Sequence, residues 1–270
     1  MERIDLQGVP ETMLQTLYAR AAHSKRSDHR FYDAKAIEIV EQMDYDFSKA
    51  EKDIATSAGV ITRTILLDKM VSRFVKENPE GTVVNIACGL DTRFYRVDNG
   101  SIRWYNLDLP ETIAVRRRFL TETERVSMIP KSAMDESWAG DVAKTENKTL
   151  IVMEGVTMYL TEQDVKQILS IIDNRFDSVE IIMELMNPWI VKRMKEKSIE
   201  ATNAKFAWGV KSGKDLKSIA VGFDWVKDVS LVEGMKVIYP IYRLFDWIPV
   251  VKNISNKLIV LEKGGIENEK

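Results

Sequence analysis

The 270-residue chain has few of the residues that carry redox and metal chemistry, with one cysteine and two histidines. A single cysteine excludes an internal disulfide framework and suits a reducing compartment, so we expect a cytoplasmic protein. Two histidines and one cysteine also disfavour a zinc site, and we expect no bound metal.

The chain also lacks an excess of either charge. Its 39 Lys and Arg residues and 41 Asp and Glu residues give a formal net charge of -2. A general nucleic-acid or membrane-surface binder needs a basic excess, so we expect neither partner. No apolar run approaches the ~20 residues that span a bilayer. The charged start Met1 to Asp5 lacks the apolar core of an export signal.

Before residue 80 the chain is predicted to be helical. Thr12 to Ala22, Ala34 to Met43 and Ile61 to Val75 carry apolar residues at three- and four-residue spacing. No strand pattern is convincing before Thr82. We therefore expect an N-terminal helical lid over residues 1–80.

After residue 80 short apolar runs alternate with amphipathic stretches. This alternation predicts an α/β domain over residues 81–263, with a mostly parallel, doubly wound sheet and helices on both faces. An inserted helix is expected at about 187–208, and a frayed tail at 264–270. The expected strands are Val83 to Ala87, Trp104 to Leu107, Val126 to Ile129, Leu150 to Met153, Val179 to Met183, Lys236 to Tyr239 and Leu258 to Leu261.

The most informative stretch is the first of these strands and the turn Ala87-Cys88-Gly89 that follows it. Nineteen residues after Gly89, Asp108 ends the next strand. A tight turn beside such a carboxylate can hold a nucleoside, with the backbone near its charged end and the carboxylate on the ribose hydroxyls. The alternative is an ordinary turn with Asp108 capping a helix. The glycines of a dinucleotide fingerprint are missing, which disfavours a nicotinamide oxidoreductase.

Other charged residues in the pattern each have two interpretations. Glu154 follows the strand Leu150 to Met153, either on the ligand side of the sheet or at an exposed strand end. Arg63, on an otherwise apolar helix face, can reach a carboxylate, although a snorkelling surface arginine is the commoner case. Arg116 to Arg118 are expected on a solvated helix face. Cys88 is expected to be a buried small residue rather than a nucleophile.

Taken together, three blocks resemble the leucine carboxyl methyltransferase family, and most closely its bacterial branch of polyketide O-methyltransferases. The blocks are Asn85 to Arg96, Leu107 to Glu111 and Glu154 to Leu160. The first contains the letters CGLDTRFYR, which are quite specific. The resemblance implies a Rossmann-like class I methyltransferase fold that binds S-adenosylmethionine.

The resemblance also implies roles for single residues. The methionine carboxylate would contact Arg63, and the methionine amino group would lie near Glu154. Tyr159 would lie close to the acceptor pocket. The remaining cofactor contacts would be Ala87, Cys88 and Gly89 along the methionyl part, Asp108 with Leu109 at the ribose, Ala133 and Met134 at the adenine, and Lys25 or Arg26 from the lid. Family members usually have glycine at the position of Ala87, whose methyl group would crowd the cofactor.

The scarcity of histidine favours one acceptor class. A carboxylate is ionised at neutral pH and needs no base, whereas a phenol with a pKa near ~10 usually does. We therefore expect an O-methyltransferase acting on a small-molecule carboxylic acid, with Tyr159 and Arg63 orienting the acceptor, as a monomer or homodimer. The alternative is a noncatalytic protein of the same fold that binds an adenosyl ligand.

Overall fold

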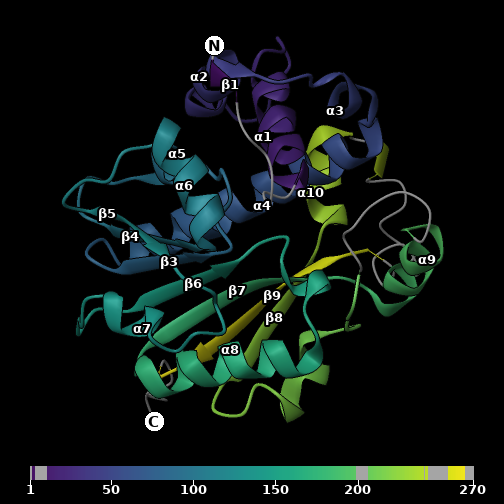
Figure 1. Cartoon of the computed structure of the whole chain (residues 1–270). Helices are drawn as coiled ribbons and strands as arrows, with labels where there is room; N and C mark the ends of the chain where they lie inside the picture. The colour runs from purple at the N-terminus through teal and green to yellow at the C-terminus, as the bar shows by residue number, and fades with distance from the viewer. Residues whose placement is uncertain (1, 4–10, 199–205, 240, 243–254, 265–270) are drawn as a thin grey trace.

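The computed structural model describes residues 2–3, 11–198, 206–239, 241–242 and 255–264. Its centre is a seven-stranded sheet in the order β5-β4-β3-β6-β7-β9-β8 (Figure 1). In this sheet β9 runs opposite to the other six strands, which confirms the expected mostly parallel sheet. The strands are β3 (Thr82–Ile86), β4 (Arg103–Asp108), β5 (Val126–Pro130), β6 (Thr149–Met153), β7 (Val179–Leu185), β8 (Asp224–Ser230) and β9 (Lys257–Lys263).

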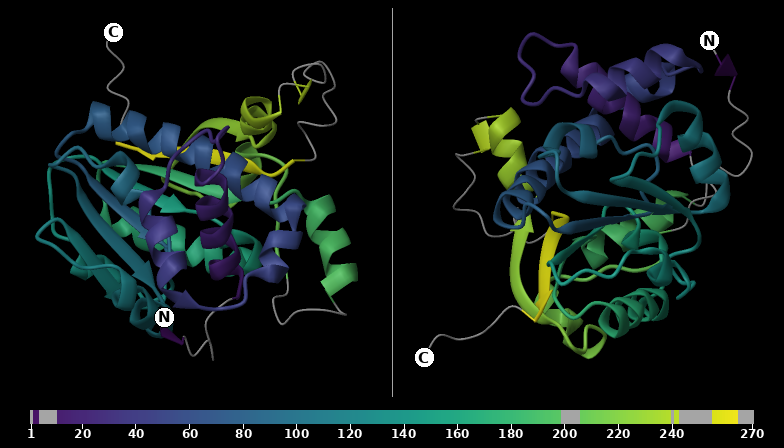
Figure 2. Two further views of the ribbon diagram at one scale, coloured as in Figure 1. Left: turned by 90° about the horizontal axis from the view of Figure 1, so that it is seen from above. Right: turned by 90° about the vertical axis from the view of Figure 1, so that its left-hand side faces the viewer.

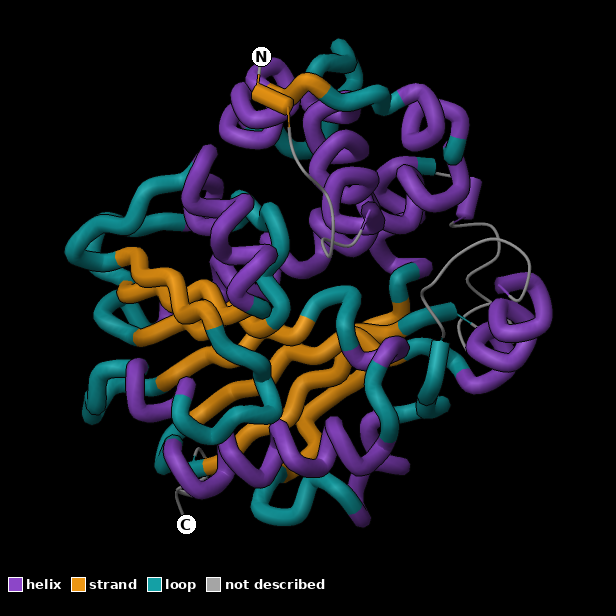
Figure 3. The backbone as a smooth tube through the Cα atoms, in the orientation of Figure 1, coloured by secondary structure: helices purple, strands orange, loops and turns teal. Residues whose placement is uncertain are grey.

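Helices cover both faces of the sheet, as expected. Buried residues of α4 and α5 pack on one face, and those of α7 and α8 pack on the other. In Figure 3 the sheet runs between the helices above it and α8 below. The helices are α1 (Glu11–Ser24), α2 (Ala34–Gln42), α3 (Ser48–Lys52), α4 (Ile54–Glu77), α5 (Phe94–Val97), α6 (Pro110–Phe119), α7 (Trp138–Asp141), α8 (Glu162–Arg175), α9 (Pro188–Ser198) and α10 (Val232–Ile238), with short 3-10 turns η1 (Thr157–Tyr159) and η2 (Gly213–Ser218).

Local signals explain where several of these helices begin. Pro110 occupies the first turn of α6, where its fixed φ angle suits a helix and its missing N–H costs nothing. The side chain of Thr161 accepts a hydrogen bond from the N–H of Asp164, and the Asp164 carboxylate accepts one from the N–H of Thr161. This reciprocal capping box fixes the start of α8.

The N-terminal helices form a further layer over the turn after β3 (Figure 2). Leu14 and Leu17 of α1 and Ile39 of α2 share one apolar cluster with Cys88 and Leu90. Because this layer rests on the turn that leaves the sheet, its position is tied to the site described below.

Strand order reverses between β3 and β6. The chain runs from β3 outward to β4 and β5 and then returns to place β6 on the other side of β3. In an open α/β sheet the carboxyl ends of the strands at such a reversal leave a crevice for a ligand. Asp108 of β4 and Glu154 after β6 lie on its two sides.

Two expectations near the C-terminus were wrong. Of the predicted strand, Lys236 to Ile238 lie in helix α10 and Tyr239 caps its end. Gly234 of this helix packs so closely that an added Cβ would lie 2.7 Å from Thr62 of α4. The sequence Asp224–Ser230 forms β8, which was not predicted because its residues do not alternate between apolar and polar. Each of these segments takes its structure from the neighbour on which it packs.

Smaller differences also occur at the ends of the chain. A two-residue parallel pair, β1 (Glu2–Arg3) with β2 (Met43–Asp44), precedes Thr82. The expected inserted helix begins at Pro188 as α9, but 199–205 lie outside the described residues, as do 265–270 of the expected tail. Among the described helices, none is both long enough and apolar enough to cross a membrane.

Candidate active site

The turn after β3 adopts a backbone conformation that favours glycine. Gly89 has a φ angle of 47°, and Ala87 has one of 55°. A left-handed conformation costs an L-residue such as alanine about 1–2 kcal/mol. Ala87 is the only described non-glycine residue with a positive φ angle, so the turn retains its shape despite the alanine.

The backbone of this turn is fixed by Asp108. One carboxylate oxygen, Oδ2, accepts a 2.8 Å hydrogen bond from the N–H of Gly89, and Oδ1 accepts one of 2.8 Å from the N–H of Leu109. Burial raises the pKa of Asp108. The side chain of Thr112 also hydrogen-bonds to this carboxylate. An ionised carboxylate has about four acceptor positions, so one is left for a ligand hydroxyl.

Helix α1 covers the same turn from outside. A Cβ at Gly89 would lie 3.0 Å from Cγ of Met13. The guanidinium of Arg116 donates a 2.9 Å hydrogen bond to the carbonyl oxygen of Gly89. Arg116 is buried, so its expected place on a solvated helix face was wrong, whereas Arg117 and Arg118 are exposed as expected.

Arg63 and Glu154 meet across the site. Nε of Arg63 donates a 2.6 Å hydrogen bond to Oε1 of Glu154, and Nη1 donates one of 2.8 Å to Oε2 of Glu184 at the end of β7. Both Arg63 and Glu154 are largely buried, so Glu154 is not at an exposed strand end and Arg63 is not on the surface. Gly155, with a φ angle of 67°, leaves room for this guanidinium, since a Cβ there would lie 3.3 Å from Nη1.

Glu154 is also held by a second arginine. Its Oε2 accepts a 2.6 Å hydrogen bond from Nη2 of Arg93, which is itself fully buried. The two arginines hold the pKa of Glu154 below its ordinary value even though burial alone would raise it. Glu154 therefore stays ionised at neutral pH and can attract a cationic group.

Asp33 links the N-terminal helices to this centre. Its Oδ2 accepts hydrogen bonds from Nε of Arg20 at 3.2 Å, Oγ1 of Thr92 at 2.6 Å and Nη1 of Arg96 at 2.6 Å. Its Oδ1 caps α2 through the N–H of Ala36 at 2.9 Å. One buried carboxylate thus fixes both the start of a covering helix and the loop after the turn at Gly89.

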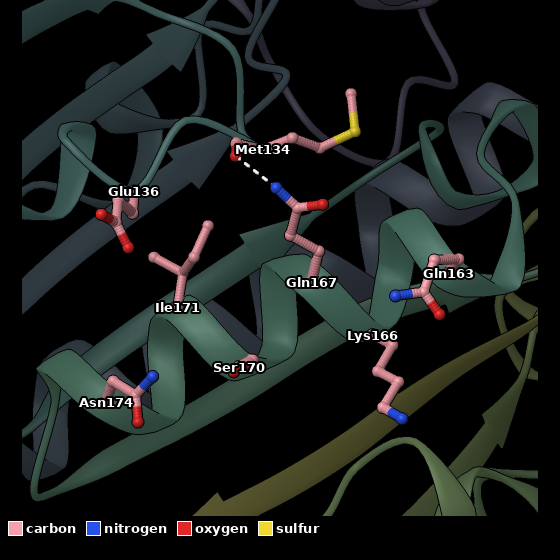
Figure 4. A pocket seen from close by; sticks show the side chains of 8 residues that line it. All are labelled: Met134, Glu136, Gln163, Lys166, Gln167, Ser170, Ile171 and Asn174. Carbon is pink, nitrogen blue, oxygen red and sulfur yellow. Dashed lines mark hydrogen bonds between the residues drawn. The ribbon is translucent and has the colours of Figure 1, made fainter.

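Ala133 and Met134 lie in the loop after β5, on the α8 side of the sheet. The indole N–H of Trp138 donates to the carbonyl of Ala133 at 3.0 Å, and Nε2 of Gln167 donates to that of Met134 at 2.7 Å. Figure 4 shows the second bond beside a shallow pocket of ≈ 370 Å³. Met134 is the only predicted site residue that lines this pocket, which otherwise runs along α8 and Glu136.

Tyr159 lies in η1, directly after the Glu154 turn. Its ring stacks on Phe206 with centroids 5.2 Å apart. Burial raises the pKa of its hydroxyl, so Tyr159 remains protonated at neutral pH and can donate a hydrogen bond. The charge of Arg63 acts on the same hydroxyl, which places these two predicted acceptor residues in one neighbourhood.

Lys25 is not joined to the other predicted residues by any bond that the structure describes. Its Nζ donates a 2.8 Å hydrogen bond to Glu41, and its side chain is half exposed. The adjacent Arg26 pairs with Asp28. Contact of either residue with a cofactor stays a prediction.

The two histidines and the cysteine make packing and hydrogen-bond contacts within the fold. Nε2 of His23 accepts a 2.9 Å hydrogen bond from the N–H of Arg30, and His29 packs beside Tyr32. Burial raises the pKa of the Cys88 thiol to about 12, so it is not a nucleophile at neutral pH. No group of three metal-ligating side chains occurs within the part of the chain that the structure describes.

Sequence reasoning missed Glu184 and did not assign roles to Arg93 or Asp33. Glu184 carried a usable signal, because a charged residue stands near the carboxyl end of the fully buried strand Val179–Leu185, close to where Glu154 follows β6. Arg93 lies within the first resemblance block, but nothing in that block shows that its side chain points inward to three carboxylates.

The chain is similar to known methyltransferases over most of its length. The family model described as leucine carboxyl methyltransferase matches residues 13–173. The tetracenomycin polyketide synthesis O-methyltransferase TcmP of Streptomyces glaucescens is 32% identical over 235 residues, covering 86% of this chain and 87% of the relative. The S-adenosyl-L-methionine-dependent methyltransferase dpfgK of Gibberella zeae is 26% identical, covering 83% and 82% respectively.

Solved structures share the fold at low identity. A DUF574 family protein from Streptomyces avermitilis has a TM-score of 0.59 at 14% identity, covering 91% of this chain and 97% of that one. The plantazolicin methyltransferase BamL, solved with a substrate analogue and S-adenosylhomocysteine, has a TM-score of 0.51 at 11% identity, covering 94% and 99%.

Proposed function

The chain belongs to the leucine carboxyl methyltransferase family, and from this premise we propose that it is an S-adenosylmethionine-dependent O-methyltransferase acting on a small-molecule carboxylic acid. The observation that carries the proposal is the convergence of Asp108, the Gly89 turn and Glu154 at the point where strand order reverses. One relative named as an O-methyltransferase and one named as an S-adenosyl-L-methionine-dependent methyltransferase each match over most of the chain.

The residues present fit such a cofactor. The Asp108 carboxylate has an acceptor position left for a ribose hydroxyl, and Glu154 offers a negative charge to the amino group. Two of the five N–H donors of Arg63 are used by Glu154 and Glu184. The remainder can bind the methionine carboxylate or the acceptor. When bound, S-adenosylmethionine supplies a methyl group already activated by its sulfonium.

The protein's contribution is then position and exclusion of water. Holding two reactants in line can supply several kcal/mol of the barrier reduction, roughly 7–11 kcal/mol in the best intramolecular cases. Tyr159, which stays protonated, and Arg63 can both donate hydrogen bonds to an acceptor carboxylate. The apolar cluster of Met158, Met186 and Val191 adjoins Tyr159 and would keep water away.

The positions of the two histidines and the protonation of Tyr159 also favour a carboxylate acceptor. His23 lies in the last turn of α1 and accepts a backbone hydrogen bond, and His29 lies in the loop that follows this helix. Tyr159 is a donor at neutral pH rather than a base. A phenol or alcohol would need a proton acceptor that these residues do not provide, whereas a carboxylate needs none.

The first experiment is calorimetric titration with S-adenosylmethionine, with NAD as the control. Micromolar binding of S-adenosylmethionine alone is expected, followed by methyl ester formation when carboxylic acids are screened with labelled cofactor. If the cofactor binds but aromatic and aliphatic acids are never methylated, the noncatalytic alternative is favoured. If the cofactor does not bind, the proposal fails.

A further inference from the structure

An unbroken series of ion pairs runs from α1 to β7 beneath the candidate site. Each member is joined to the next by a contact of 3.2 Å or less, and the side chains are mostly buried. In order along the series, the residues are Arg20, Asp33, Arg96, Asp68, Arg93, Glu154, Arg63 and Glu184. Asp91 is a branch from Arg93, which is bound to three carboxylates.

The series carries one more negative than positive charge among the residues that the structure describes. Four arginines face five carboxylates, and Asp108 and Arg116 on either side of Gly89 add one charge of each sign. Buried charges are screened little by salt or water. A surplus carboxylate in such a place stabilises a ligand that brings a positive charge.

Glu184 is the carboxylate at the ligand end of this series. Its Oε2 accepts hydrogen bonds from Nη1 of Arg63 and, at 3.0 Å, from the N–H of Gly155. Its Oε1 accepts one of 3.2 Å from Nδ2 of Asn256. The side chain of Thr157 in η1 donates a hydrogen bond to the backbone carbonyl of Glu184. Glu184 is thereby joined both to the turn after Glu154 and to the 3-10 turn that carries Tyr159.

We propose that Glu184 makes the site prefer the cationic methyl donor over its neutral product, and this rests on the proposed function. In the transfer, a bond forms between an acceptor oxygen and the methyl carbon while the carbon–sulfur bond breaks, and its electron pair stays on sulfur. S-adenosylmethionine, with net charge of about +1 at neutral pH, thereby loses its sulfonium charge and becomes zwitterionic S-adenosylhomocysteine, whose net charge is zero. Glu184 then no longer attracts a positive charge at sulfur, and this loss favours product release.

The test compares the two ligands in one variant. Glu184→Gln keeps the shape of the side chain but removes the charge. We expect the ratio of the dissociation constants of S-adenosylhomocysteine and S-adenosylmethionine to fall about tenfold, the effect of one unit charge at short range in a partly screened site. A loss of Arg63 geometry would weaken both ligands alike and leave the ratio unchanged, and that result would overturn the proposal.

Two further variants separate charge from structure. Glu184→Asp keeps the charge on a shorter chain, so it should retain the wild-type ratio even if both ligands bind more weakly. Glu180→Gln is the matched control, because Glu180 is also buried on β7 but pairs with Arg73, away from the carboxyl end of the strand. Its ratio should equal that of wild type.

If Glu184→Gln does not fold, the wild-type protein still gives an answer. An analogue of S-adenosylhomocysteine with a basic amine in place of sulfur is cationic only below the pKa of that amine. Its affinity should fall about tenfold relative to S-adenosylhomocysteine as pH rises through that pKa. No such fall would overturn the proposal, whereas failure of wild type to bind either adenosyl ligand would refute the proposed function instead.

Discussion

The carboxylate of Asp108 accepts a 2.8 Å hydrogen bond from the backbone N–H of Gly89, which precedes it by nineteen residues. The bond ties the end of β4 to the turn after β3, the neighbouring strand. It fixes the two parts of the proposed nucleoside site relative to each other.

Replacing Asp108 should weaken cofactor binding. A hydrogen bond to a charged group contributes about 1.5–3 kcal/mol, so Asp108→Ala should bind S-adenosylmethionine roughly 10- to 100-fold more weakly in calorimetry. Glu111→Ala, at an exposed position in the first turn of α6, should bind like wild type. Unchanged affinity of Asp108→Ala would show that the assigned cofactor site is wrong.

Ala87→Gly should stabilise the protein. Glycine relieves the left-handed strain of about 1–2 kcal/mol at a φ angle of 55° but adds entropy to the unfolded chain. The free energy of unfolding, from denaturant titration, should rise by about 0.5–1 kcal/mol. Ala21→Gly within α1 should instead lower it by about 1 kcal/mol. A loss of similar size in both variants would contradict the strain at Ala87.

Acid should destabilise the fold through Asp91. Arg93 and Arg96 hold the pKa of Asp91 well below its ordinary value. The unfolded chain therefore binds more protons, and this contribution to stability, complete above pH ~4, is lost as pH falls toward the folded-state pKa. Glu154 acts in the same sense, whereas Asp108, with its raised pKa, acts in the opposite sense.

Asp91→Asn isolates this effect. At pH 7 it should lower the free energy of unfolding by about 3 kcal/mol, because Arg93 loses one of its buried partners. The difference from wild type should shrink steadily in urea titrations at pH 5, 4 and 3. A difference independent of pH would mean that the carboxylate charge of Asp91 does not contribute.

Cys88 should resist alkylation in the native protein. Burial raises the pKa of its thiol to about 12, so almost no thiolate exists at pH 8. Iodoacetamide should label the protein at least about 100-fold more slowly in buffer than in denaturant, as followed by intact mass. Equal labelling rates would show that this turn opens readily.

Much of the fold could be predicted from local patterns, because buried parallel strands are continuous apolar runs. Residues 83–86, 150–153 and 258–261 lie in strands as expected. The prediction failed for Lys236 to Tyr239, where a run of three apolar residues after a lysine suits a strand or a helix equally well. Only the close contact of Gly234 with Thr62 on α4 distinguishes the two.

The spacing of Gly89, Asp108 and Glu154 could be read from the sequence, because strand length and the α/β alternation place such residues at the carboxyl edge of a sheet. Which charged side chains pair with one another depends on the tertiary structure. Arg63 and Glu184 are 121 residues apart, and Arg20 and Leu90 are 70 apart. Long polar side chains look alike in a sequence whether they are solvated or buried. Their partners depend on how distant elements pack together. For this reason the expectation for Arg116 is solvent exposure, whereas the structure shows it bonded to the carbonyl of Gly89.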